Sequence, residues 1–93
     1  MARVVVPAAL RQLADGAHAI DVEHADGAPL CDVLDALAAR SPHLIRRLRD
    51  ERGELRRYVN VYIDGADVRR AAGLATTVPA SAEILVLPSV AGG

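Results

Sequence analysis

The chain has 93 residues, of which 52% are hydrophobic and 25% charged, and its formal net charge at pH 7 is −1. This balance is typical of one globular domain with a moderate core and argues against intrinsic disorder. Tyr58 and Tyr62 are the only aromatic residues, which disfavours base stacking and thus nucleic-acid binding. The apolar runs are too short to span a membrane, and the lone cysteine, with no signal peptide expected, favours a cytoplasmic protein.

The first part of the chain predicts two strands joined as a hairpin. Residues 3–6 are a β-branched run that stops at Pro7. Residues 8–14 are ambiguous between a loop and a frayed turn. Residues 19–24 alternate apolar and polar side chains, as a half-buried strand does.

A helix is expected next, because Pro29 suits a first helical position. One apolar stripe follows at helical spacing: Leu30, Val33, Leu34 and Leu37. Ser41 and Pro42 end this helix and cap a short second helix through Leu48. Residues 50–57 then form a charged connector.

The last part of the chain predicts further strands. Residues 58–63 are the clearest strand, and an Asp-Gly pair after them makes a tight turn. Val68 begins a short return strand, and residues 69–77 form an irregular loop. After a turn over residues 79–82, residues 83–87 form the last strand.

The first and last strands should pair in parallel at the centre of a mixed sheet, because each is apolar on both faces. One helix stripe covers one face only. The other face then exposes Val5, the two tyrosines, and either Leu85 with Leu87 or Ile84 with Val86. Such an apolar patch usually marks a partner surface; the alternative is burial under the charged connector.

The spacing of the chemically reactive residues predicts no catalytic site and no metal site. His18 and His24 would lie about 20 Å apart along a strand, and His43 has no second ligand at helical spacing. Cys31 lies at the edge of the helix stripe, and this position favours a small core side chain over a reactive thiol as its role. No serine-nucleophile or phosphate-loop motif is present, and the connector arginines alternate with acids as on a solvated surface. The chain is predicted not to be an enzyme.

The most informative segment is the ending Pro88-Ser89-Val90-Ala91-Gly92-Gly93, directly after the last strand. Two residues without a Cβ can thread a narrow channel, and free termini are usually mobile. We therefore expect a folded domain over residues 1–88 and a flexible tail over residues 89–93. All eleven basic residues are arginine, so no lysine side chain could accept an acyl group.

The order of elements and this ending resemble the ubiquitin-like β-grasp sulfur carriers of the ThiS/MoaD family. The resemblance implies an α+β β-grasp fold, in which a mixed four- to five-stranded sheet packs on one main helix with a short second helix. Residues 58–63, 67–69 and 73–76 look most similar to the subgroup that carries sulfur for cysteine biosynthesis. One departure is Pro79-Ala80-Ser81-Ala82-Glu83, where family members commonly have a Gly-Asp turn.

By this resemblance, Gly93 is adenylated by an ATP-dependent, ubiquitin-activating-like adenylyltransferase and sulfurtransferase, and then becomes a thiocarboxylate. The carrier itself is expected to bind no cofactor and no metal. Gly92, Ala91 and Val90 would thread the partners' channels. The expected partner-docking residues are Leu74, Leu85, Leu87, Val5 and Tyr62.

The resemblance leaves the sulfur acceptor open. In the cysteine-type interpretation, a pyridoxal-phosphate-dependent cysteine synthase accepts the sulfur and a metallopeptidase releases the product. Molybdopterin, thiamine or a sulfur-containing natural product would use the same tail. Two other classes are a ubiquitin-like modifier joined to lysines through Gly93, and an interaction domain whose Gly-Gly ending is incidental.

Overall fold

The computed structural model describes residues 1–88. Its main sheet has five strands in the order β2-β1-β7-β4-β5. These strands are β1 (Ala2–Val5), β2 (Ala19–Val22), β4 (Val59–Ile63), β5 (Ala66–Asp67) and β7 (Glu83–Pro88). β1 and β7 pair in parallel at the centre, as the sequence predicts, and the other pairs are antiparallel. The fold is therefore α+β with a mixed sheet.

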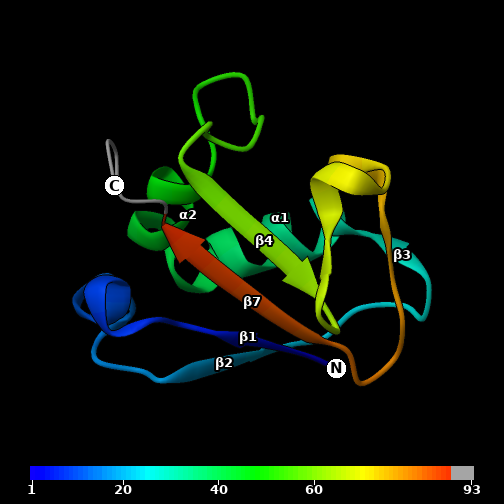
Figure 1. Cartoon of the computed structure of the whole chain (residues 1–93). Helices are drawn as coiled ribbons and strands as arrows, with labels where there is room; N and C mark the ends of the chain where they lie inside the picture. Colours follow the sequence, from blue (N-terminus) through cyan, green and yellow to red (C-terminus); the bar gives the residue numbers. More distant parts are fainter. Residues whose placement is uncertain (89–93) are drawn as a thin grey trace.

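Helices α1 (Leu30–Arg40) and α2 (Pro42–Leu48) both lie on one side of the sheet, behind it in Figure 1. A short ladder of β3 (Ala28–Pro29) with β6 (Thr77–Val78) lies beside the start of α1. Three 3₁₀ helices complete the part of the chain that the structure describes: η1 (Ala8–Ala14), η2 (Val68–Arg70) and η3 (Gly73–Ala75). Within residues 1–88, no helix is long and apolar enough to cross a membrane.

The core lies between the sheet and the two helices. The predicted α1 stripe is at most 1% exposed: Leu30, Val33, Leu34 and Leu37. It meets alternate residues of the strands, and Val4, Ile84 and Val61 are all fully buried. Each such side chain contributes about 1.5–3 kcal/mol by leaving water. The apolar residues that recur every 3.6 positions in the helix and every 2 positions in the strands therefore meet in one apolar layer.

Several element boundaries differ from the sequence prediction by a residue or two, and two of the differences have a clear physical cause. Pro29 is not the first helical residue: its ψ is 152°, and it pairs with Thr77 in the β3–β6 ladder. The return strand is Ala66–Asp67 and does not include Val68. Val68 instead starts η2, because the Asp67 carboxylate accepts the backbone N–H of Arg69 at 2.9 Å and turns the chain.

The ambiguous segment after Pro7 is neither a loop nor a frayed turn but the 3₁₀ helix η1. Leu10 and Ala14 on this helix are buried against the core. Asp15 ends it in the left-handed region, with a φ of 54°. Two apolar contacts therefore fix a segment that lacks a clear helical stripe.

Candidate functional site

The face of the sheet opposite the helices, called the open face below, carries a row of apolar side chains across three strands. Leu85 on the central strand pairs with Val5 of β1 on one side and Tyr62 of β4 on the other. All three are half-buried, and Leu87 beyond them is 36% exposed. The register thus selects Leu85 and Leu87, rather than the buried Ile84 and Val86, for this surface.

The charged connector does not bury this row. Arg56 binds α2 twice, through its backbone N–H to the carbonyl of Leu48 and through Nε to that of Arg46, at 2.9 and 2.8 Å. Leu55 forms an isolated bridge with Arg49 and packs against the core. The connector therefore lies against the helices, and the open face is free in residues 1–88 to contact a partner.

Leu74 lies apart from the other expected docking residues. It belongs to η3, which packs against α1 and η2, and its side chain is half-buried against the core. The five residues predicted for docking therefore form two surfaces. Four gather on the open face: Val5, Tyr62, Leu85 and Leu87.

The chain leaves the sheet beside the start of β4, where Pro88 pairs with Val59. Arg69 from η2 holds this corner with its guanidinium group. Nη1 donates to the carbonyl of Val59 and, at 3.1 Å, to Oδ1 of Asn60, while Nη2 donates to the carbonyl of Arg56 at 2.7 Å. Nothing in the spacing of Arg69 in the sequence indicates this role, because no local pattern shows that a loop arginine reaches back to β4.

One carboxyl group of the connector has a shifted pKa. Loss of solvent acts to raise the pKa of Asp50, but the backbone N–H groups of Glu54 and Arg52 and the charges of Arg52 and Arg56 hold it below 3.8. The Asp50 carboxylate accepts those two N–H groups at 3.1 and 2.9 Å. Its negative charge therefore helps to shape the connector.

No group of three or more His, Cys, Asp or Glu side chains within residues 1–88 could hold a metal ion. Cys31 is half-buried at the start of α1, and its thiol donates to Oδ1 of Asp32 at 3.8 Å. Nε2 of His24 lies 3.0 Å from the carbonyl oxygen of Pro79 and 3.2 Å from that of Val78. His24 therefore joins two loops of the fold.

The remaining predicted site residues lie outside the described residues. They are the tail-threading residues Val90, Ala91 and Gly92 and the carboxyl-bearing Gly93. The structure places only the point from which they depart, at Pro88 beside Val59.

A mixed five-stranded sheet with a central parallel pair and α1 across one face defines a ubiquitin-like β-grasp protein. The chain belongs to the ThiS family, which matches residues 4–93. Sulfur carrier protein CysO of Mycobacterium tuberculosis is 36% identical over 92 residues, which cover 97% of this chain and 96% of that protein.

The solved structures similar to this one have the same fold. A chain of the BexX/CysO complex of Amycolatopsis orientalis superposes with a TM-score of 0.88 at 31% identity, over the whole of both chains. M. tuberculosis CysO gives a TM-score of 0.85 at 32% identity, over 97% of this chain and all of that one. SAMP1 of Haloferax volcanii gives 0.82 at 30% identity, over 99% and 98%. The resemblance to CysO-like β-grasp sulfur carriers is confirmed.

Proposed function

We propose that this protein carries sulfur as a thiocarboxylate on its C-terminal Gly93. The observation that carries the proposal is the family match, which extends over the Gly-Gly ending to residue 93. Similarity to CysO over nearly the whole of both chains supports the same role. The protein is then a carrier that other enzymes act on, rather than a catalyst.

The chemistry explains why a partner and ATP are needed. A carboxylate is a poor electrophile, so its oxygen first attacks the α-phosphorus of ATP on the partner, which releases pyrophosphate and forms an acyl-adenylate. Sulfide then attacks the Gly93 carbonyl and AMP leaves; where a protein persulfide is the nucleophile instead, the acyl disulfide that it forms is next cleaved by a second thiol, which leaves with the persulfide's inner sulfur as a disulfide. The product is an anionic thiocarboxylate at neutral pH, and the anion is the reactive form of sulfur in nucleophilic attack.

The described fold is consistent with the docking part of this proposal. The open face presents Val5, Tyr62, Leu85 and Leu87 beside the corner where the chain leaves the sheet. A partner that covers this face is positioned to receive the residues after Pro88. Gly92 and Gly93, which lack a Cβ, suit a narrow channel.

Cysteine biosynthesis is the acceptor pathway we favour, because of the similarity to CysO. The thiocarboxylate would attack an aminoacrylate on a pyridoxal-phosphate-dependent synthase, forming a carrier–cysteine adduct. A metallopeptidase would then release the cysteine and restore the Gly93 carboxylate. Transfer to molybdopterin, thiamine or a natural product would need the same thiocarboxylate and a different acceptor.

A second candidate function is a protein modifier. The observation that favours it is the structural similarity to SAMP1, a small archaeal modifier protein. In that case an amine of a target lysine replaces sulfide as the nucleophile. The chain contains no lysine, so the acceptor lysines would lie on other proteins.

The test is mass spectrometry of the C-terminal tryptic peptide after incubation with ATP, sulfide and an adenylating enzyme of the ubiquitin-activating type. Cleavage after Arg70 yields residues 71–93, which contain no methionine and no cysteine. A sulfur-for-oxygen mass gain on this peptide therefore cannot come from side-chain oxidation of sulfur. We expect this mass gain in the reaction that contains ATP and no gain in the reaction without ATP. Gly93 found on lysines of other proteins, with no thiocarboxylate, would favour the modifier.

A further inference from the structure

One end of the open face is acidic. Asp21, Asp64 and Glu83 are exposed where β7 begins, and the Asp64 carboxylate accepts the backbone N–H of Glu83 at 2.9 Å. Arg3 lies beside them: it pairs with Glu83 in register, and its Nε lies 3.8 Å from Oδ1 of Asp21. Arg40 reaches the Asp21 carbonyl from α1, on the helix side. Carboxylates therefore outnumber arginines on this end of the face.

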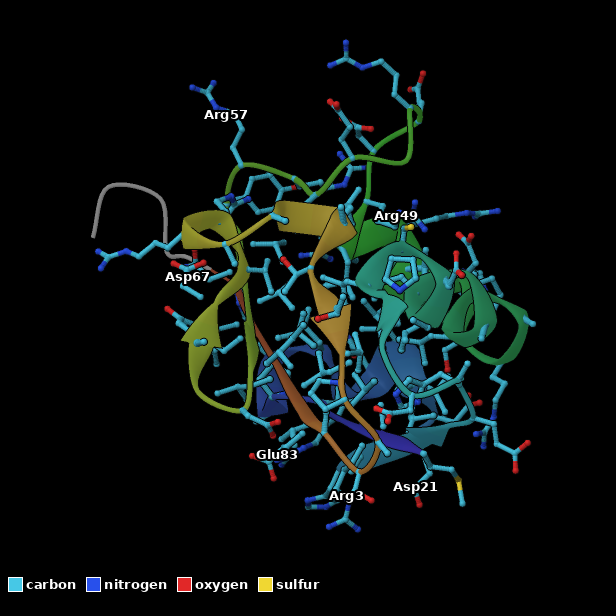
Figure 2. All side chains as sticks on the ribbon, turned by 90° about the vertical axis from the view of Figure 1, so that its right-hand side faces the viewer. Arg3, Asp21, Arg49, Arg57, Asp67 and Glu83 are labelled. Atoms are coloured by element: carbon cyan, nitrogen blue, oxygen red, sulfur yellow. The ribbon has the colours of Figure 1, made fainter. Side chains whose placement is uncertain are left out.

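The opposite end is basic. Arg57 and Arg70 are exposed and make no hydrogen bond or ion pair within residues 1–88. The Arg69 guanidinium group is held by carbonyl oxygens, so no carboxylate neutralises it in that part of the chain. The nearby Asp67 accepts the backbone N–H of Arg69. Figure 2 shows Arg57 projecting from one end of the molecule, with Arg3, Asp21 and Glu83 at the other.

The chain departs from the basic end, because Pro88 pairs with Val59 at the start of β4. At a rise of about 3.3 Å per residue, the two ends lie about 20 Å apart along β4 and its flanking residues. This separation exceeds the screening length of about 8 Å at physiological ionic strength. Each end therefore interacts with a partner independently of the other.

We infer that these charges set the orientation in which the adenylating enzyme binds the open face. On the enzyme, acidic side chains around the channel that receives the C-terminal residues meet Arg57, Arg69 and Arg70 of the carrier. A basic region of the enzyme, farther from that channel, meets the acidic end of the open face. The apolar row across Val5, Leu85 and Tyr62 supplies contact area, but it offers little to distinguish one direction from its reverse. Reversed docking would oppose like charges and turn the tail away from the channel. The inference rests on the proposed function.

Charge reversal at each end tests this inference. Arg57→Glu changes the net charge by −2 and Glu83→Arg by +2, so the double variant keeps the wild-type net charge of −1. Arg47→Glu on α2 is the matched control, since Arg47 is exposed and unpaired within residues 1–88. Affinity for the adenylating enzyme and the rate of thiocarboxylate formation are measured over a range of carrier and salt concentrations.

Both single variants should weaken binding about five- to tenfold at low salt, and the double variant should be the weakest. Added salt should shrink these differences, and Arg47→Glu should match the wild type. A response to net charge alone would give the single variants opposite effects and return the double variant to wild-type affinity, which would overturn the inference. So would equal effects of Arg57→Glu and Arg47→Glu.

The two readouts separate this inference from the proposed function. A wild-type chain that binds the enzyme but gains no sulfur contradicts the proposed function, while the affinities of the variants still decide the orientation. A wild-type chain that is loaded, with variants that bind equally well, contradicts the orientation alone. A chain that neither binds nor is loaded contradicts both.

Discussion

Arg69 takes the place of a missing strand neighbour at the edge of β4. β5 is two residues long and pairs only with Tyr62 and Ile63, so the carbonyl of Val59 has no strand partner on that side. The Arg69 guanidinium group satisfies that carbonyl together with the one of Arg56. Backbone acceptors at a sheet edge need such partners or water.

Replacing Arg69 with methionine should lower the free energy of unfolding by about 1–2 kcal/mol, because charge-assisted hydrogen bonds to backbone carbonyls are lost. The melting temperature should fall by about 5–10 °C for a domain of this size. Thermal and urea denaturation measure both quantities. Arg70→Met is the control, since Arg70 has no partner within residues 1–88. Equal stability of the two variants would show that the contacts of Arg69 contribute nothing.

Gly92→Val should abolish sulfur loading through steric hindrance in the partner's channel, because a β-branched side chain is added next to the reacting carbonyl. The melting temperature should stay at the wild-type value. Loading is measured on the tryptic peptide that begins at Ala71. Unimpaired loading of this variant would contradict the threading role of Gly92.

Among the elements, β7 has two faces with different roles, because its side chains alternate between the core and the open face. Val86 faces the helices and is 1% exposed, whereas its neighbour Leu87 is 36% exposed on the open face. Val86→Ala should therefore cost about 2 kcal/mol of stability and leave the proposed docking surface intact. Leu87→Ala should change stability by less than about 1 kcal/mol but raise the KM for loading about tenfold. Denaturation and loading kinetics on both variants check this division, and a KM unchanged by Leu87→Ala would remove Leu87 from the docking surface.

The contribution of the Asp50 carboxylate in the connector to the stability of the fold should depend on pH. The pKa of Asp50 in the folded protein lies below 3.8, so the fold favours its ionised form. Well above pH 3.8 the carboxylate is ionised in both the folded and the unfolded state, and its full contribution to stability is present. That contribution is lost as the pH falls through 3.8 and then through the lowered pKa of the folded state. The stability gap between the wild type and Asp50→Asn should thus be constant at neutral pH and close in acid.

Urea denaturation over a pH series measures this gap. Glu51→Gln is a suitable control, because Glu51 is exposed and makes no hydrogen bond within residues 1–88. A gap that widens as the pH falls would reverse the sign and contradict the role of the Asp50 charge.

In the molecule as a whole, the buried core and the proposed sulfur-carrying end occupy separate stretches of the sequence. The buried apolar residues run from Ala2 to Val86, ahead of the proposed tail. Deleting Gly92 and Gly93 should leave the melting temperature unchanged and abolish sulfur loading. Loading of the shortened chain at the wild-type rate would contradict the role of the Gly-Gly ending.

Much of this architecture could be predicted from local patterns. The α1 stripe and the two-faced apolar runs of β1 and β7 specify the buried layer and the central parallel pair. The last strand alone does not reveal which of its faces is buried, because both are apolar; that follows from its register with Val5 and Tyr62. The role of Arg69 depends on a long-range contact between a loop and β4, which no local period encodes. Leu74 is separated from the open face for a similar reason, since tertiary packing on α1 positions η3.

The central position of β7 also has a consequence for synthesis on the ribosome. β7 lies between β1 and β4, so a nascent chain that stops before Glu83 lacks the strand that joins the two halves of the sheet. Such an incomplete chain exposes unpaired strand edges and cannot close its core. We therefore expect the complete fold to form only after β7, the strand that precedes the proposed sulfur-carrying end, has been made. If the proposed adenylating enzyme recognises the folded open face, it would not consume ATP on incomplete chains.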